Sequence, residues 1–134
     1  MKKRWLIFSV LVLAAALALR SEQWWYPAPI EQNEAAYDEL VRLTRACCSE
    51  GEHMDDLAYL ERQDPERARL MDALDIDRVH SYPGVIFLER DLWGSLSTMH
   101  TYSLNGQPAK IIGCYTVEHI QGRWYRSHSL PCLL

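Results

Sequence analysis

The sequence lacks the short motifs that mark common enzyme and metal sites. Gly94-Ser95-Leu96-Ser97 differs from the G-x-S-x-G nucleophile elbow of hydrolases and precedes a predicted strand instead of a helix. His53 and His119 each follow a glutamate, but neither has the second histidine of H-E-x-x-H. No C-x-x-C pair, zinc-ligand spacing or calcium loop is present. The chain therefore offers no candidate catalytic, cofactor or metal residue, which favours a protein that is not an enzyme.

Basic residues are few beyond the N-terminus. After Arg20 the chain has ten basic and eighteen acidic residues, a net charge of about −8 against −4 for the whole chain. Residues 31–77 hold fourteen of the acids and only five arginines. Nucleic acid requires a basic surface, so this balance excludes a nucleic-acid partner. It allows a basic protein partner, and the candidate binding residues are Asp38, Glu39, Asp55 and Asp56. The alternative is a solvated acidic helix face, which is the commoner explanation of such a run.

The first twenty residues have the layout of an export signal. Lys2, Lys3 and Arg4 are followed by fifteen uncharged residues, from Trp5 to Leu19. By the positive-inside rule, the N-terminus stays in the cytoplasm and the chain after Arg20 crosses the membrane. We therefore expect a periplasmic-side protein at the cell inner membrane.

Aromatic residues at both ends of this segment favour an anchor that is not cleaved. Trp5 and the group Trp24, Trp25 and Tyr26 are about 29 Å apart on a helix that rises 1.5 Å per residue, close to the ~30 Å hydrocarbon thickness. Tryptophan and tyrosine prefer the two interfaces of a bilayer. This predicts a single span over residues 5–26.

Two alternatives to the uncleaved anchor stay open. Ala16-Leu17-Ala18 has the small-x-small pattern of a cleavage site, so the protein could be secreted after cleavage following Ala18. The aromatics could instead begin the folded domain and pack on its core. In the favoured division, residues 1–26 are the signal-anchor, residues 27–30 a proline-stiffened linker and residues 31–134 a single domain.

Four cysteines in a small exported domain indicate disulfides. A bond between the adjacent Cys47 and Cys48 closes a strained eight-membered ring, so we favour a bond from each to one of Cys114 and Cys132. One alternative is a Cys114–Cys132 bond, with Cys47 and Cys48 joined to each other or available to a partner. Another is that Cys47 and Cys48 are small buried apolar residues.

Helical periodicity predicts two to three helices in the acidic half of the domain. Residues 31–48 place apolar side chains at three- and four-residue steps, and this helix ends around Gly51. A short second helix is expected over residues 54–62. Asp64-Pro65-Glu66 combines an N-cap, a proline at the first helical position and an acid in the first turn, so a third helix is predicted from Pro65 to about Leu74.

The period changes to that of strands after Tyr82, with strands predicted over residues 84–92, 95–104, 108–120 and 123–129. Asn105-Gly106 and Gln121-Gly122 are tight-turn signals between them. This predicts an α+β fold, with the helices packed on one face of a four-stranded antiparallel meander behind the N-terminal membrane-anchor helix. The order of elements is similar to the layout of cystatin-like and NTF2-like domains, whose cone can host a pocket, although no shared motif accompanies the similarity.

Two-residue turns would place His100 opposite Ile111 and His119 opposite Trp124. One apolar face then collects the candidate pocket residues Tyr102, Tyr115, Trp124 and His100. The histidines on this face are about 13 Å or more apart along the strands, too far to bind one metal ion. In the same register Cys114 lies on the other face, which conflicts with a bond to the helices.

We favour a membrane-anchored envelope module that binds another protein, such as an accessory subunit, an inhibitor or an immunity-type protein. The first alternative is a small-molecule-binding, cone-like domain. The second is a small envelope hydrolase built from dispersed acids and histidines, which would require strongly perturbed pKa values in one cleft.

Overall fold

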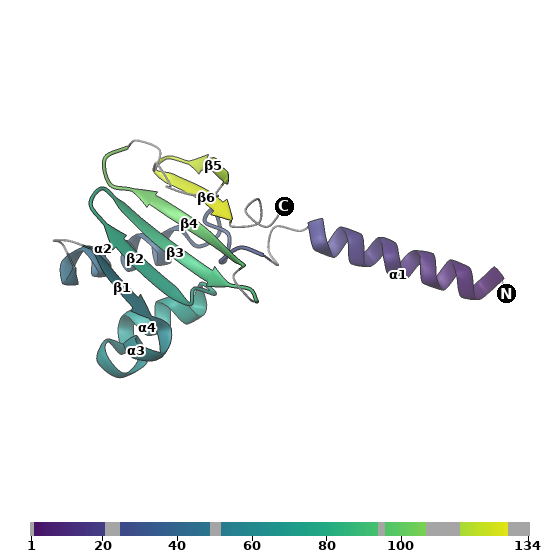
Figure 1. The fold of residues 1–134 in the computed structure, drawn as a ribbon, viewed down its shortest axis with the longest axis horizontal. Helices are drawn as coiled ribbons and strands as arrows, with labels where there is room; N and C mark the ends of the chain where they lie inside the picture. The colour runs from purple at the N-terminus through teal and green to yellow at the C-terminus, as the bar shows by residue number, and fades with distance from the viewer. Residues whose placement is uncertain (1, 21–24, 49–51, 94–95, 107–115, 129–134) are drawn as a thin grey trace.

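The computed structural model describes residues 2–20, 25–48, 52–93, 96–106 and 116–128. Within these residues the chain has four helices and a six-stranded antiparallel sheet, which confirms the α+β class (Figure 1). The helices are α1 (Lys2–Arg20), α2 (Glu34–Cys47), α3 (Leu57–Gln63) and α4 (Pro65–Ala73). The strands are β1 (His53–Asp56), β2 (Arg78–Tyr82), β3 (Val85–Asp91), β4 (Ser97–Ser103), β5 (Thr116–Gln121) and β6 (Trp124–His128).

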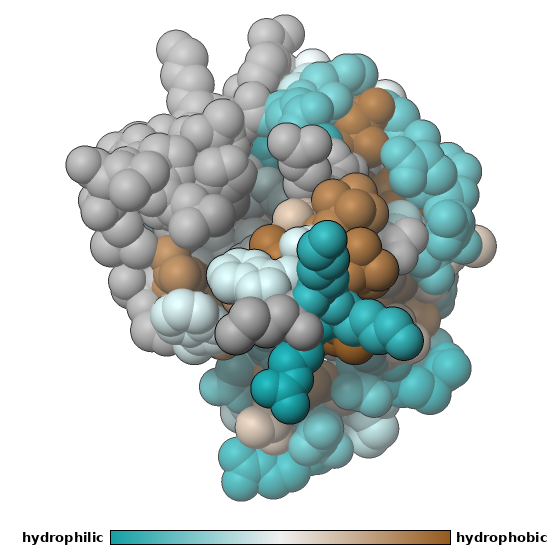
Figure 2. All heavy atoms as spheres, turned by 90° about the vertical axis from the view of Figure 1, so that its right-hand side faces the viewer, coloured by the Kyte–Doolittle hydropathy of each residue, from teal (hydrophilic) through white to brown (hydrophobic). Residues whose placement is uncertain are grey.

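Helix α1 projects away from the rest of the molecule (Figure 1). Its large apolar side chains are exposed, and Trp5 is 70% exposed. Figure 2 looks from the side toward which α1 projects, and hydrophobic side chains lie in the middle of that view beside strongly hydrophilic ones. None of the described helices combines the length and the apolar character needed to cross a membrane.

Helix α4 begins at the predicted residue, whereas α2 begins at Glu34, three residues after its predicted start. Helix α2 buries Tyr37, Leu40, Val41 and Thr44, which are spaced by three or four residues and face the sheet. At the start of α4, the Asp64 side chain accepts a hydrogen bond from the Arg67 backbone N–H, with Pro65 in the first turn, as predicted.

Two strands were not predicted. The second predicted helix was placed at Met54, but His53–Asp56 is strand β1, and α3 starts only after Asp56 caps it through the Tyr59 N–H at 2.7 Å. Strand β2 pairs with β1 on one side and with β3 on the other. The chain turns from β2 to β3 at Gly84, whose φ of 85° favours glycine.

The predicted meander pairs each strand with the next one in the sequence, and it is wrong for the last three strands. The strand order is β1-β2-β3-β4-β6-β5, so β6 lies between β4 and β5. Strand β4 pairs with β6, so His100 lies opposite Arg126, not Ile111, and Tyr102 lies opposite Trp124. This pairing brings Trp124 into the core, where its ring contacts Tyr102 at 4.8 Å. Asn105-Gly106 therefore marks a turn but does not join neighbouring strands.

The β5–β6 hairpin at Gln121-Gly122 is confirmed, with a different register. His119 lies opposite Tyr125 instead of Trp124, and the pairing is irregular between His119 and Gln121. Since one extra residue moves side chains to the other face of a strand, His119 shares a face with Tyr125 and not with His100. The ring contact between His119 and Tyr125, at 5.0 Å, agrees with this.

The core lies between the helices and one face of the sheet. Its buried members are Ile30, Tyr37, Leu40, Val41, Leu60, Ala68, Met71, Leu74, Ile76, Val79, Ile86, Leu88 and Trp124. Asp55 lies opposite Val79 in the β1–β2 pair and therefore points to the same side. A carboxylate thus enters the helix layer from the edge of the sheet.

Candidate functional site

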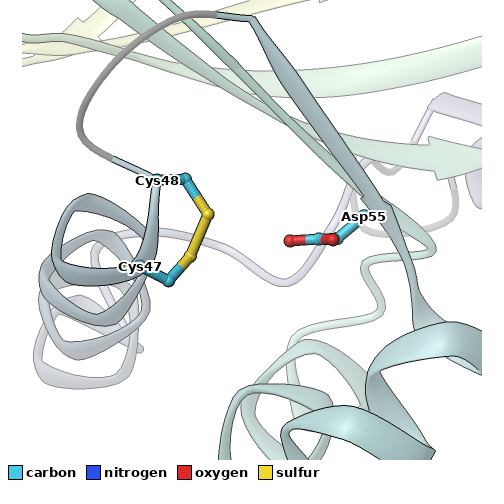
Figure 3. A group of neighbouring side chains, drawn as sticks. All are labelled: Cys47, Cys48 and Asp55. Carbon is cyan, nitrogen blue, oxygen red and sulfur yellow. A yellow bond between two sulfur atoms is a disulfide. The ribbon is translucent and has the colours of Figure 1, made fainter.

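Helix α2 ends in a disulfide between two adjacent residues, Cys47 and Cys48 (Figure 3). Cys48 has left the helical conformation, with φ −136° and ψ 45°. Cys47, the last helical residue, is exposed, and Cys48 is half-buried. The predicted bonds from Cys47 and Cys48 to Cys114 and Cys132 are therefore wrong, since these two sulfurs are bonded to each other. Cys114 and Cys132 themselves lie outside the described residues.

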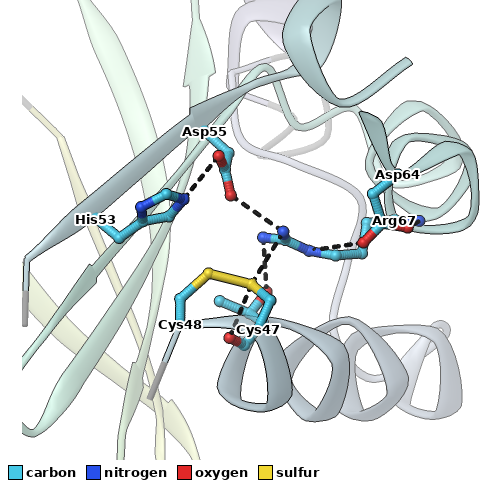
Figure 4. Close-up of a disulfide and its surroundings, with 7 residues drawn as sticks. Cys47, Cys48, His53, Asp55, Asp64 and Arg67 are labelled. Carbon is cyan, nitrogen blue, oxygen red and sulfur yellow. Dashed lines mark hydrogen bonds and ion pairs between the residues drawn. A yellow bond between two sulfur atoms is a disulfide. The ribbon is translucent and has the colours of Figure 1, made fainter. Parts of the chain in front are cut away.

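A buried arginine lies directly beside this disulfide (Figure 4). The Arg67 side chain, on α4, is 3% exposed, and its Nη1 lies 3.0 Å from Oδ2 of Asp55. The same nitrogen is 3.2 Å from Sγ of Cys47, and Nη2 donates to Oγ1 of Thr44 at 3.4 Å. One guanidinium thus connects α4, β1 and α2.

Asp55 has a second partner. His53 Nε2 lies 2.8 Å from Oδ1 of Asp55, and the His53 side chain is 46% exposed. On the other side of the guanidinium, Asp64 Oδ2 is 4.0 Å from Arg67 Nε. A buried carboxylate and a buried guanidinium are tolerated when they are paired, as Asp55 and Arg67 are here, although Nε of Arg67 has no hydrogen-bond partner among the described residues.

The same cluster has a partial resemblance to a metal site. Ligand atoms of Cys47, Cys48 and Asp55 lie within 4.8 Å of one another (Figure 3). However, the two sulfurs are bonded to each other, and thiolates, not disulfides, are metal ligands. The Arg67 guanidinium already supplies the positive charge next to Asp55. The donor set in this oxidised form therefore does not suit a metal ion.

A separate cleft of about 200 Å³ lies between the start of the domain and the sheet. Its wall includes His100 on β4, Arg126 on β6 and Tyr26 just after the N-terminal segment. The Tyr26 ring stacks on His100 at 5.9 Å, and the Arg126 guanidinium lies 5.4 Å from the centre of the Tyr26 ring. The remaining lining residues are Pro27, Pro29, Ile30, Glu31, Gln32 and Ile120.

His100 is held in a neutral form by its surroundings. The Tyr37 hydroxyl donates to the backbone oxygen of Ala28 at 2.5 Å, so its oxygen accepts from Nδ1–H of His100 at 3.0 Å. Burial, with a contribution from the Arg126 charge, lowers the pKa of His100 to about 3. Burial also raises the pKa of Tyr37. Both side chains are therefore uncharged at neutral pH.

A third polar cluster lies on the sheet face opposite the helices. Glu89 accepts from His80 at 2.7 Å and from Arg78 at 3.3 Å, and Arg78 also pairs with Asp91. Burial alone would raise the pKa of Glu89, but hydrogen bonds from His80 and Ser97 and the Arg78 charge hold it below its usual value. These contacts form an ion-pair network, in which Nε of Arg78 is buried without a hydrogen-bond partner among the described residues.

The predicted pocket residues are only partly brought together. His100 lines the cleft, whereas Tyr102 and Trp124 pack on the core. Tyr115 lies outside the described residues. At the predicted membrane interface, Trp24 also lies outside them, and the Trp25 backbone oxygen accepts from the Thr98 hydroxyl. The contact of Tyr26 with His100 matches the alternative in which these aromatics begin the folded domain.

The predicted partner-binding acids have four different roles. Asp38 is exposed, while Glu39 pairs with Arg42 at 2.5 Å. Asp56 caps α3, and Asp55 is buried against Arg67, which excludes it from an exposed surface. Exposed acids that the prediction did not choose, Glu31 and Glu34, lie near Asp38 at the start of α2.

Sequence reasoning missed Arg67, and it missed Tyr37 as a partner of His100. For Arg67 a signal existed, because it precedes the buried residues Met71 and Leu74 by four and seven positions. That spacing places a charge on the apolar side of the predicted helix, where it requires a buried partner.

Comparisons of the chain with protein-family models, with curated proteins and with solved structures find no match.

Proposed function

We propose that this chain is an extracytoplasmic protein-binding module and that the cleft beside His100 receives a side chain of its partner. The observation that carries the proposal is the neutral histidine in the cleft wall. A general base works best with a pKa near the operating pH, and a pKa of about 3 leaves His100 too weak a base for that role. The cleft therefore favours binding over acid–base catalysis.

The size of the cleft favours a single side chain over a free ligand. Its volume is about 200 Å³. Clefts that hold drug-sized molecules have roughly 300–1,000 Å³. This difference also argues against the small-molecule-binding alternative.

The charge next to the cleft favours a basic side chain. We name Glu31, Glu34 and Asp38 the acidic rim. Glu31 lines the cleft, and the other two acids follow it in the sequence and are exposed one turn apart on α2. Arg126 in the wall is paired with Glu118 at 2.9 Å, which offsets its positive charge. A partner lysine or arginine would enter the cleft next to Glu31, while the Tyr26 ring stays in contact with His100 and Arg126 in the wall.

Helix α1 supports delivery of the domain across a membrane. It begins with Lys2, Lys3 and Arg4, and the apolar side chains that follow are exposed instead of packed on the domain. An apolar surface of this extent requires a cover, and the export machinery and the lipid bilayer both provide one. We propose that residues 5–26 retain the protein at the inner membrane, with release after cleavage following Ala18 as the alternative.

Site-specific photo-crosslinking in cells that produce the full chain tests the binding proposal. A photoreactive amino acid at Gln32, in the cleft wall, should give one defined adduct. The same group at the exposed Gln63, at the end of α3, is the matched control and should not. Equal adducts from both positions, or none from Gln32, would contradict the proposal.

Charge neutralisation then tests the acidic rim. The triple variant E31Q/E34Q/D38N should lose the Gln32 adduct, whereas E52Q/E61Q/D72N, which removes three exposed acids elsewhere, should keep it. Loss in both variants would indicate general attraction by net charge instead of a defined surface. The intact mass of the purified chain separately reports whether residues 1–18 remain, so failure of the localisation proposal is distinguishable from failure of the binding proposal.

A further inference from the structure

The Cys47–Cys48 disulfide combines access with a buried cation. Cys47 is exposed, and Cys48, which an incoming thiolate would attack, is half-buried. Arg67, which is almost fully buried, donates to the sulfur of Cys47 at 3.2 Å. Asp55 and Asp64 hold the guanidinium in place from two sides. A purely structural disulfide needs neither access nor a charge aimed at one sulfur.

We propose that Cys47 and Cys48 form a thiol–disulfide exchange site that accepts two electrons from a dithiol, with Cys48 as the attacked sulfur and Cys47 as the leaving thiolate. This activity is independent of the cleft and of the proposed binding function.

The exchange has two steps. A thiolate of the dithiol attacks Sγ of Cys48, the bond between the two cysteines breaks, and its electron pair stays on Sγ of Cys47. The second thiolate of the dithiol then attacks the sulfur of its own mixed disulfide and releases Cys48 as a thiolate. The dithiol leaves as a disulfide, and Cys47 and Cys48 become a pair of thiols after protonation.

Arg67 decides which sulfur leaves. A thiol leaves faster when its thiolate is stabilised, and a neighbouring arginine stabilises a thiolate. The structure places the guanidinium at Cys47, and Asp55, which would oppose this effect, is shared between Arg67 and His53. The Thr44 backbone oxygen, 3.3 Å from the same sulfur, can accept a hydrogen bond once the thiol is protonated.

The first test uses the full native chain and dithiothreitol. The protein is equilibrated in graded mixtures of reduced and oxidised dithiothreitol, trapped by alkylation, and analysed by peptide mass spectrometry, with circular dichroism on the same samples. Cys47 and Cys48 should become reduced together while the circular dichroism is unchanged. A pair that stays oxidised until the domain unfolds would overturn the proposal.

The second test compares two single-thiol variants, C48S/C114S/C132S with Cys47 alone and C47S/C114S/C132S with Cys48 alone. The thiol pKa is measured from the pH dependence of alkylation in each folded variant. The pKa of Cys47 should be lower than that of Cys48 by about one unit or more, which is about tenfold more thiolate below both pKa values. An equal or higher pKa at Cys47 would overturn the assignment of the leaving group, and the first test does not depend on these variants folding.

Discussion

Replacing Arg67 with methionine tests the central contact of the helix layer. Arg67→Met keeps much of the side-chain volume but removes the cation from Asp55, which is 3% exposed. Of its ion pairs with described residues, Asp55 then keeps the one with His53, at 2.8 Å. The variant therefore contains a buried carboxylate without its main partner.

The expected loss of unfolding free energy is large. Removing one member of a buried ion pair typically costs about 3–5 kcal/mol, because the remaining charge stays buried. The stability of a whole domain is roughly 5–15 kcal/mol, so Arg67→Met should be near the limit of folding. In a domain of about 100 residues this loss lowers Tm by at least about 12 °C.

Urea unfolding followed by circular dichroism measures the change, with the double variant Asp55→Leu/Arg67→Met as the matched control. Replacing both members of a buried pair by apolar residues is often neutral, so the double variant should return to within about 1 kcal/mol of the wild type. A loss below about 1 kcal/mol in Arg67→Met would refute the assignment of a buried ion pair. A double variant as unstable as the single one would show that the contacts of Arg67 with α2 carry the stability instead.

Three further predictions follow from other parts of the domain. Because burial and the Arg126 charge lower the pKa of His100 to about 3, the unfolded chain binds a proton between pH ~6.5 and ~3 that the folded chain does not. The free energy of unfolding should therefore decrease as the pH is lowered through this window, by up to about 1.4 kcal/mol per pH unit. The decrease should be less steep in His100→Gln, and urea unfolding between about pH 4 and 6 measures both. Asp56→Ala removes the α3 cap and should lower the free energy of unfolding by about 1 kcal/mol, whereas Asp56→Ser should keep most of that stability. Equal losses of stability in thermal unfolding of the two variants would count against capping. Leu88→Ala, in the core, should lower the free energy of unfolding by about 2–5 kcal/mol, while Trp93→Ala, at an exposed position, should change it by less than about 0.5 kcal/mol. Similar losses in the two variants would contradict the packing of Leu88 in the core.

Local signals in the sequence predict the helices better than the sheet. The start of α4 depends on Asp64 and Pro65, which are neighbours in the chain, so it is predicted to the residue. The position of β6 depends on which of two strands pairs with β4, and a turn such as Asn105-Gly106 carries no information about that choice. Strand β1 is four residues long with three polar side chains, so neither length nor alternation identifies it.

The candidate sites show the same limit. Ring strain ranked the Cys47–Cys48 bond behind the bonds to Cys114 and Cys132, and it stayed only an alternative, yet it forms where α2 ends and Cys48 adopts a non-helical conformation. The spacing of Arg67 to Met71 indicates burial, but its partner Asp55 becomes visible only once β1 is known. His100 was chosen as a pocket residue, and its actual neighbours Tyr26 and Tyr37 come from segments more than sixty positions earlier in the chain.

The strand order also determines when the domain can be completed during synthesis. Of the described strands, the last in the sequence, β6, is an interior strand, and the one before it, β5, is at the edge. Until residues 124–128 have left the ribosome, and the translocation channel if the chain is exported, the β6 side of β4 has no strand to pair with it. Its backbone donors and acceptors are then open to other chains, as at any bare sheet edge. A chain that ends before Trp124 would therefore expose one side of β4, which is covered by β6 in the complete sheet. This exposed side would be a new site for aggregation.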